Sequence, residues 1–127
     1  MNPAQKPLDN PTATASLPRE TYVRRLLERY RQTPGTLGRI RWEDRTLAAE
    51  LHRRGVPLER VEAAFNLAAA RRIFREADAM PLQPIRSLHY FLPVLEEIQT
   101  ANIDPGYLAY VEHKLAAHLG LPPSDRR

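Results

Sequence analysis

Arginine is the residue type on which any chemistry of this chain depends. The 127-residue sequence has nineteen basic residues, of which seventeen are arginines. Between Arg19 and Arg75 there are fourteen arginines and seven acidic residues, a local balance of +7, whereas the rest of the chain has a balance of −3. Guanidinium groups pair with phosphate oxygens in a fixed two-pronged geometry. The asymmetry predicts one basic face that binds nucleic-acid phosphates. The codon usage of a GC-rich genome is the alternative explanation for so much arginine.

The candidate phosphate contacts lie on the predicted helix exteriors or in the loop after residue 32. They are Arg24, Arg25, Arg29, Arg31, Arg39, Arg41, Arg45, Arg53, Arg54, Arg71, Arg72 and Arg75. Several phosphate contacts from one face would give salt-sensitive binding that is largely independent of base sequence. A solvated helix exterior would carry the same charges without any ligand.

Residue patterns for catalysis or metal binding are not found in the sequence. It has no cysteine, no phosphate-binding glycine loop, no nucleophile elbow and no metalloprotease motif. His113 and His118 are five residues apart, so they do not share one helix face as metal ligands would. His89 lies in an apolar run and is predicted to be a core or interface histidine. We therefore expect no catalytic residue, no metal and no cofactor.

The single tryptophan, Trp42, has two possible roles. It stands beside the basic loop and can stack on a nucleic-acid base. A lone tryptophan at the start of a helix is more often a core anchor, and the sequence favours that role.

One long helix is expected to organise the other elements, and it is predicted over residues 57–77. Pro57 suits the first helical position, and no later proline or glycine interrupts the segment. Two apolar stripes indicate that the helix is covered on more than one side. The stripes are Leu58, Val61, Phe65, Ala68 and Ala69, and Ala64, Leu67, Ala70, Ile73 and Phe74.

The remaining helices follow from the same spacing rules. They are predicted at 18–32 with Ser16 as N-cap, at 42–54 with Gly55 after the end, from Pro84 through a kink at Pro93, and at 105–119 with Asp104 as N-cap. In the loop at 33–41, Leu37 and Ile40 are expected to fill the core. No segment alternates as a strand would. The sequence thus predicts an all-α fold, a single compact bundle of about five helices at 18–121, with a flexible tail at 1–17 and a short tail at 122–127.

The segment L-A-A-E-L-H-R-R-G-V-P-L-E-R-V has the outline of a helix-turn-helix. A helix that reads DNA needs an exposed polar face, whereas the second helix here is alanine-rich and apolar on two sides. The segment is therefore interpreted as a packing hairpin, with a DNA-reading pair as the alternative.

Three stretches together resemble the helical C-terminal module of bacterial DnaD-like replication and primosome proteins. They are L-H-R-R-G-V-P-L-E-R-V-E-A-A-F, R-R-I-F and P-I-R-S-L-H-Y-F-L-P-V-L-E-E-I. Tyr90, Val94 and Leu95 stand near that family's tyrosine-containing motif, with Pro93 inside it and no tryptophan after it. The resemblance implies a module that binds DNA or a replication partner, encoded on a plasmid, phage or other mobile element. The arginine-rich face would then be the DNA side.

The sequence leads to one main functional hypothesis and two alternatives. The first is a non-catalytic nucleic-acid-binding module of replication or mobile-element machinery, with DNA favoured over RNA. The second is a protein-interaction or oligomerisation subunit whose contacts come from the Tyr90/Phe91 region and the N-terminal tail. The third is a helix-turn-helix transcription regulator. No apolar run is long enough for a membrane span and no signal peptide is recognised, so no membrane partner and a cytoplasmic location are expected.

Overall fold

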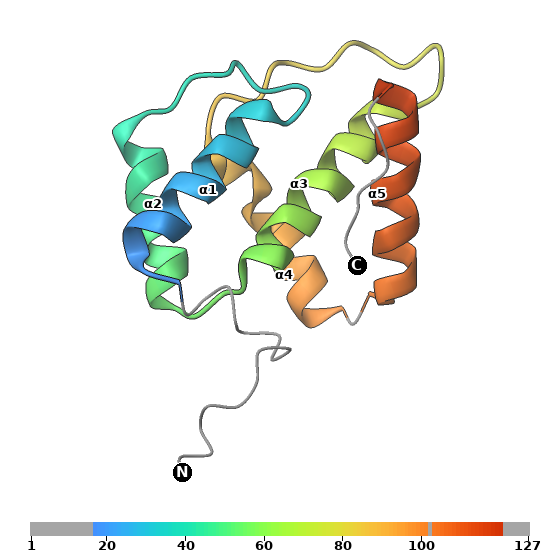
Figure 1. Cartoon of the computed structure of the whole chain (residues 1–127). Coiled ribbons are helices and arrows are strands. Elements are labelled where there is room, and N and C mark those ends of the chain that lie inside the picture. Colours follow the sequence, from blue (N-terminus) through green and yellow to red (C-terminus); the bar gives the residue numbers. More distant parts are fainter. Residues whose placement is uncertain (1–16, 102, 121–127) are drawn as a thin grey trace.

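The computed structural model describes residues 17–101 and 103–120 and shows an all-α fold (Figure 1). The helices are α1 (Arg19–Gln32), α2 (Trp42–Arg53), α3 (Leu58–Ile73), the 3-10 helix η3 (Leu88–Phe91), α4 (Leu92–Thr100) and α5 (Pro105–Leu119). The described residues contain no β-strand, only one isolated bridge between Thr36 and Ile85. The predicted fold class, a compact helical bundle, is confirmed.

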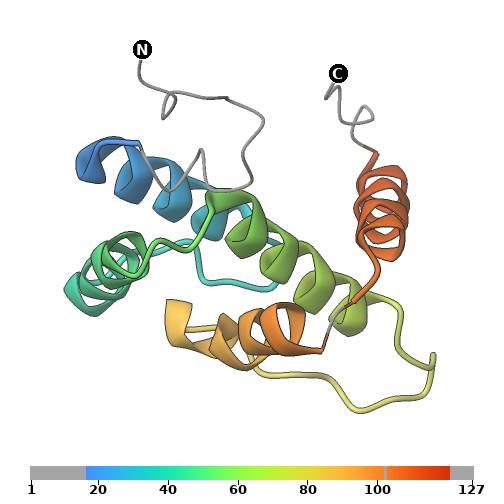
Figure 2. The same cartoon turned by 90° about the horizontal axis from the view of Figure 1, so that it is seen from below.

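Helix α3 is the centre of the bundle. Figure 2 shows α1 and α2 on one side of it, α4 beneath it and α5 beyond its far side. Both predicted apolar stripes are used, because eight residues along the helix are buried: Leu58, Val61, Ala64, Phe65, Leu67, Ala68, Ala69 and Ala70. Four of the eight are alanines, whose small side chains let neighbouring helices approach closely.

The limits predicted for this helix were too wide at both ends. Pro57 is the N-cap rather than the first helical residue, and the helix ends at Ile73 rather than Ala77. Phe74 leaves helical geometry with φ −94° and ψ 38° and is 38% exposed. The residues that follow are exposed, so no packing holds another helical turn in place.

Aromatic rings join three helices in the middle of the core. The ring centroids of Tyr30 on α1 and Phe65 on α3 are 6.3 Å apart, and Phe91 of η3 lies 6.0 Å from Tyr30 and 4.9 Å from Phe65. The contacts involving Phe91 are edge-on, the arrangement that aromatic quadrupoles favour. This cluster holds η3, and with it the start of α4, against α1 and α3.

A second fastening joins α1 to the turn after α2. The Tyr22 hydroxyl donates a 2.7 Å hydrogen bond to the Val56 carbonyl, and the Tyr22 ring is fully buried. Gly55, just before Val56, has φ +77°. The left-handed turn predicted after the second helix is therefore present, although α2 itself ends at Arg53 with Arg54 as C-cap.

The helix predicted from Pro84 through a kink at Pro93 is wrong. Residues 84–87 are non-helical, Ile85 bridges to Thr36, and the Ser87 side chain caps the first turn of η3. Pro93 stands in the first turn of α4, where a proline loses no hydrogen bond. The helical spacing of apolar residues continues across Pro93 because η3 and α4 pack on the same core. Pro93 therefore stands at the start of a helix and does not kink one.

Only one of the two apolar residues predicted to fill the core from the 33–41 loop does so. Ile40 is partly buried and packs against the main core, whereas Leu37 is 41% exposed. Gly35 and Gly38 have φ of +97° and +78°, so the backbone turns sharply on either side of Leu37. This pair of turns directs Leu37 outward.

Helix α5 packs on α3 through a small second core of Leu67, Ala70 and Val111. Its N-cap is Asp104, as predicted. Only Val111 and Leu115 of this helix are buried, and the apolar residues Tyr107 and Leu119 are exposed. The predicted N-cap Ser16, the tail at 122–127 and the predicted tail up to residue 16 lie outside the described residues.

Candidate nucleic-acid interface

The twelve candidate arginines divide into two groups of six. In the first group, each guanidinium already has a partner within the protein: Arg29, Arg31, Arg53, Arg54, Arg71 and Arg72. In the second group, no guanidinium has a hydrogen bond or ion pair among the described residues: Arg24, Arg25, Arg39, Arg41, Arg45 and Arg75. The sequence alone did not separate these groups.

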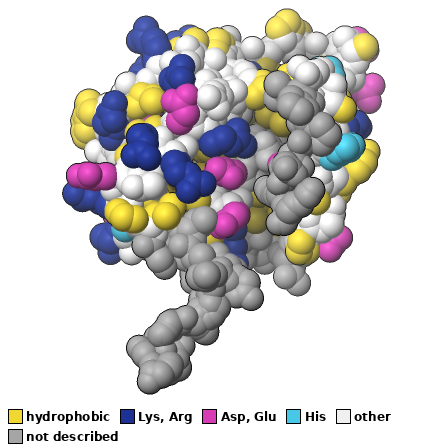
Figure 3. All heavy atoms as spheres, viewed as in Figure 1, with side chains coloured by type: hydrophobic (Ala, Val, Ile, Leu, Met, Phe, Trp, Pro, Cys, Tyr) yellow, Lys and Arg dark blue, Asp and Glu magenta, His cyan; other side chains and the backbone are white. Residues whose placement is uncertain are grey.

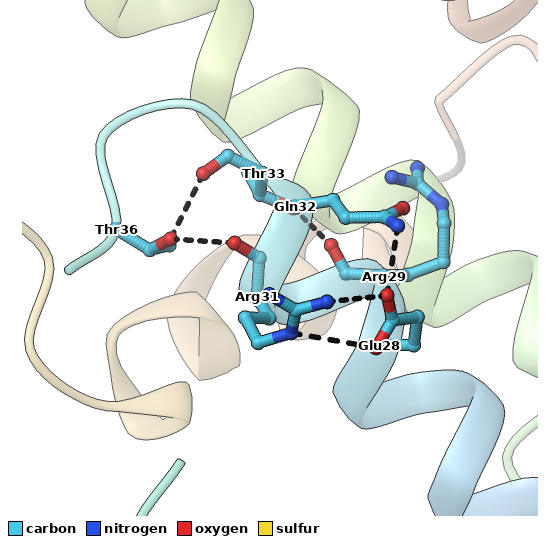
Figure 4. Close-up of polar contacts among 6 residues, drawn as sticks. All are labelled: Glu28, Arg29, Arg31, Gln32, Thr33 and Thr36. Atoms are coloured by element: carbon cyan, nitrogen blue, oxygen red, sulfur yellow. Dashed lines mark hydrogen bonds and ion pairs between the residues drawn. The ribbon is translucent and has the colours of Figure 1, made fainter. Parts of the chain in front are cut away.

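The end of α1 shows how the first group is held (Figure 4). Arg31 donates two hydrogen bonds to Glu28, the shorter at 2.6 Å, and Gln32 donates to the same carboxylate at 2.9 Å. Arg29 turns away from Glu28 toward α3, where it donates to the Asn66 side chain at 3.1 Å. Both arginines are thus committed to contacts within the bundle.

Glu50 binds both arginines at the end of α2. Arg53 approaches to 2.5 Å and Arg54 to 3.1 Å, at the i,i+3 and i,i+4 spacings that bring helix side chains together. Hydrogen bonds from Arg53 and Arg54 lower the pKa of Glu50 to about 2. The carboxylate therefore remains ionised, and keeps its two arginines, throughout the physiological pH range.

At the end of α3, Arg71 and Arg72 fasten neighbouring segments. Arg71 pairs with Glu97 of α4 at 2.5 Å, and its hydrogen bond lowers the pKa of the Glu97 carboxyl. Arg72 donates to the Gln83 carbonyl at 2.8 Å and lies over the Tyr90 ring at 5.6 Å. These two residues hold the 74–87 loop and α4 to the central helix.

Five of the six unpartnered arginines lie on α1, the loop after it, and the first turn of α2. Arg24 and Arg25 are on α1, Arg39 and Arg41 are in the loop, and Arg45 is on α2. All five are exposed. Figure 3 shows basic side chains gathered over the surface formed by α1 and α2, with acidic side chains among them. We call these five residues the α1–α2 arginine face.

The sixth, Arg75, lies beyond the end of α3 and is not on α1, the 33–41 loop or α2. It is exposed and lines a separate shallow hollow with Arg72 and Leu82. The structure therefore does not bring all twelve predicted residues together, and five of the six unpartnered ones belong to α1, the loop after it and the start of α2.

A shallow groove of about 430 Å³ runs between α1 and α2 within the α1–α2 arginine face. Its basic rim includes Arg24 and Arg45. Its floor is apolar and is formed by Val23, Leu27, Ile40 and Ala49. Glu20 and Glu28 also line the groove, and the Glu28 charge is already compensated by Arg31.

Asp44 fixes the backbone from which the loop arginines project. Its side chain is fully buried, and its two oxygens accept hydrogen bonds from the backbone N–H groups of Arg41 and Leu88, each at 2.9 Å. Sequence reasoning missed this residue. Its position could have indicated this role. It lies three residues after the N-cap Arg41, where an acidic side chain can accept a hydrogen bond from the backbone N–H of the N-cap residue.

The prediction that Trp42 is a core anchor is wrong, and of the two roles predicted for His89 the core role is wrong. Trp42 is not a core anchor, because 70% of its surface is exposed. His89 is not a core histidine, because it is exposed and its ring contacts the Ser87 hydroxyl. Trp42 precedes the packed positions of α2, and His89 lies between the buried residues Leu88 and Phe91 of η3 with its own side chain directed outward.

The histidines have packing or capping roles where their contacts are seen. His52 Nε2 lies 2.7 Å from the Leu17 carbonyl, and its ring meets the edge of Tyr22. The His118 ring packs edge-on against Phe74. No group of three or more potential metal ligands occurs among residues 17–101 and 103–120.

Comparisons with protein-family models, curated proteins and solved structures find no match for this chain. The resemblance to DnaD-like modules therefore remains a prediction. Within the part of the chain that the structure describes, no helix combines the length and apolar character needed to cross a bilayer.

Proposed function

We propose that the chain is a non-catalytic module that binds nucleic-acid phosphates through the α1–α2 arginine face. The observation that carries the proposal is the division of the arginines described above. Of the seven candidate arginines outside this face, six are engaged by carboxylate, amide, carbonyl or aromatic groups, whereas the five candidates on the face are exposed and have no such partners. An unpaired guanidinium can meet a phosphate without first breaking an internal ion pair.

The biological setting of the proposal comes from the resemblance noted in the sequence. The proposed setting is a bacterial, cytoplasmic protein of replication or mobile-element machinery that binds DNA in preference to RNA. It agrees with the resemblance and with the α1–α2 arginine face. Phosphate contacts alone carry no base sequence information, so the binding is expected to be largely independent of sequence.

The test is a titration of duplex DNA at two salt concentrations with paired charge-removal variants. Arg39→Gln with Arg41→Gln removes two charges from the α1–α2 arginine face, and Arg53→Gln with Arg54→Gln removes two charges held by Glu50. The first pair is expected to weaken binding to any sequence and to make the salt dependence shallower by about two units. The second pair has the same net charge and should bind nearly as the unmodified protein does.

Two results would contradict the proposal. One is a lack of binding to any nucleic acid at low salt. The other is an equal loss of affinity in both double variants, which would assign the binding to net charge rather than to this face.

A second candidate function is protein interaction, and one observation favours it. An open groove of about 900 Å³ lies along α3 and α5, with apolar lining from Leu108 and Leu115 and charged lining from Arg60 and Glu112. The Tyr90/Phe91 region supports this role less well, because Phe91 is buried and the exposed Tyr90 ring already has the Arg72 guanidinium over it. Light scattering on the purified chain tests the candidate, since a strict monomer with no co-purifying protein argues against it.

We do not extend the proposal to a helix-turn-helix regulator. A recognition helix needs one long polar face free to enter the major groove. Helix α3, which would have that role, is the most enclosed helix of the bundle. A selection experiment with random duplexes should therefore return no strong consensus.

A further inference from the structure

Trp42 is an exposed aromatic ring without a stacking partner. Its exposed fraction is 70%. The other exposed aromatic residues all have ring contacts: Tyr90 with Arg72, Phe74 with Lys114 and His118, and Tyr107 and Tyr110 with each other. Among the described Phe, Tyr and Trp residues, Trp42 alone has neither an aromatic nor a cationic neighbour on its ring. Most of the indole surface is therefore free to receive a planar group.

The ring also stands among the loop arginines. Arg41 directly precedes it, Arg39 is two residues earlier, and Arg45 lies one helical turn later on the same side of α2. Glu43 is the exposed acidic neighbour, whereas the Asp44 carboxylate points inward to its two backbone donors. Three unpartnered arginines thus lie within three residues of the exposed ring in the sequence, so groups that can bind phosphates and a ring that can stack belong to one short segment.

We propose that Trp42 is a platform for an unpaired base and that the chain binds single-stranded nucleic acid more tightly than duplex. This inference rests on the proposed function and specifies its substrate. A flat indole face stacks on any base, so the contact adds affinity without sequence preference. In a duplex the base faces are covered by their neighbours, and the indole then reaches only helix ends or backbone.

The groove between α1 and α2 gives a path for the strand away from the platform. Arg45, one turn from Trp42, lines this groove together with Arg24 on the opposite wall. The apolar floor accepts sugar and base surface, and the two arginines can meet successive phosphates. A single strand can bend from the platform into the groove, whereas a stiff duplex cannot follow so short a turn.

The experiment uses the intrinsic fluorescence of Trp42, which reports on this site alone because the chain has no other tryptophan. The full chain is titrated with short oligothymidylate and with a blunt duplex containing the same number of phosphates. We expect the single strand to quench the fluorescence and to bind more tightly. Trp42→Ala, followed by anisotropy of a labelled oligonucleotide, should weaken single-strand binding by about 5- to 150-fold and leave duplex binding nearly unchanged.

Two controls keep the proposal falsifiable. Trp42→Phe retains an aromatic face and should recover most of the single-strand affinity, and circular dichroism should show that both variants remain folded because the side chain is exposed. Equal affinities for the two nucleic acids, an unquenched indole, or a Trp42→Ala variant that binds single strands normally would overturn the proposal.

The outcomes also separate this inference from the proposed function. If the Trp42 proposal is overturned but duplex binding still depends on Arg39 and Arg41, the proposed function stands without the platform. If neither nucleic acid binds at low salt, both fail. Fluorescence that changes only with protein concentration would assign the ring to contacts between copies of the chain.

Discussion

The Asp44 carboxylate accepts a 2.9 Å hydrogen bond from the backbone N–H of Leu88, joining the first turn of α2 to the first residue of η3. Its second oxygen accepts from the backbone of Arg41. A charged acceptor forms stronger hydrogen bonds than a neutral one. This single side chain therefore ties the segment that carries Arg41 and Trp42 to the aromatic core around Phe91.

Replacing Asp44 should destabilise the protein more than its small size suggests. Asp44→Ala leaves two backbone N–H groups without acceptors, one of them at a buried contact, and is expected to lower the free energy of unfolding by about 2–4 kcal/mol. Asp44→Asn retains one acceptor and should lose about half as much. Urea denaturation measures both variants. Glu43→Ala, at the exposed neighbouring position, is the control and should change stability little; an equal loss there would contradict the assignment.

Releasing arginines from Glu50 should strengthen nucleic-acid binding. Glu50→Gln removes the carboxylate that holds Arg53 and Arg54, and because the pKa of Glu50 is about 2 this pairing is complete at neutral pH in the unmodified protein. The variant is expected to bind duplex DNA several-fold more tightly with a steeper salt dependence. Anisotropy titrations at two salt concentrations provide the measurement. Glu96→Gln, at an exposed position on α4, removes the same charge without freeing an arginine pair, so an equal gain there would argue that net charge is sufficient.

The same pairing predicts how stability depends on acid pH. The carboxyl has a lower pKa in the folded state than in the unfolded chain, so its contribution is present above about pH 4.5 and is lost as the pH falls toward 2. In the Glu50→Gln variant, the free energy of unfolding should therefore fall less steeply between pH 4.5 and pH 2. Urea denaturation at a series of acid pH values measures this. A profile unchanged by the substitution would show that the pair does not contribute to folding.

Tyr30 should make the bundle sensitive to alkaline pH. Burial, together with the nearby Asp44 carboxylate, raises the pKa of Tyr30 to about 12 from an ordinary value of 10.0. The unfolded chain therefore loses this proton first, and the stabilising contribution is lost as the pH rises from 10 toward 12. Tyr30→Phe should unfold at a higher pH in an alkaline titration followed by circular dichroism. Tyr110→Phe, on the exposed face of α5, should leave the alkaline midpoint in place.

Gly35 should tolerate a side chain less well than Gly38. Both have positive φ, so alanine costs about 1–2 kcal/mol of backbone strain at either position. At Gly35 the added Cβ would also lie 2.9 Å from Arg72 Nε, whereas at Gly38 nothing lies within 4 Å. Gly35→Ala should therefore displace Arg72 from Tyr90 and Gln83 and lower stability by about 1 kcal/mol more than Gly38→Ala. Thermal or urea unfolding of the two variants compares them directly.

Helix periodicity predicted the bundle well because every long helix carries a continuous apolar stripe. The buried residues of α3 belong to the two predicted stripes, and Tyr22, Leu26, Leu27 and Tyr30 of α1 recur at the expected spacing. The misplaced boundaries lie where no packing follows, as after Ile73, or where a short 3-10 turn such as η3 continues the apolar phase of an α-helix. A local pattern cannot distinguish these cases, because tertiary contacts decide them.

The candidate site was less predictable than the fold. The composition indicated a basic face. It did not indicate which arginines form ion pairs within the protein, because that depends on which carboxylates lie near each guanidinium in the folded chain. Glu50 and its two arginines are local i,i+3 and i,i+4 pairs that the sequence could have supplied. The pairing of Arg71 with Glu97 spans 26 residues and requires the fold. The exposure of Trp42 likewise follows from the start of α2, which places the ring ahead of the packed positions Leu47, Ala48 and Leu51.

The attachment of α5 has a consequence for how the molecule opens. This helix buries only Val111 and Leu115, mainly against one neighbour, whereas α3 is covered along its whole length. Native-state hydrogen exchange should therefore resolve two cooperative units, with amides of α5 exchanging through a low-energy detachment and those of α1 and α3 only on global unfolding. Detachment of α5 would leave the α1–α2 arginine face folded, so the protein can lose its outermost helix before it loses the surface that we propose binds nucleic acid.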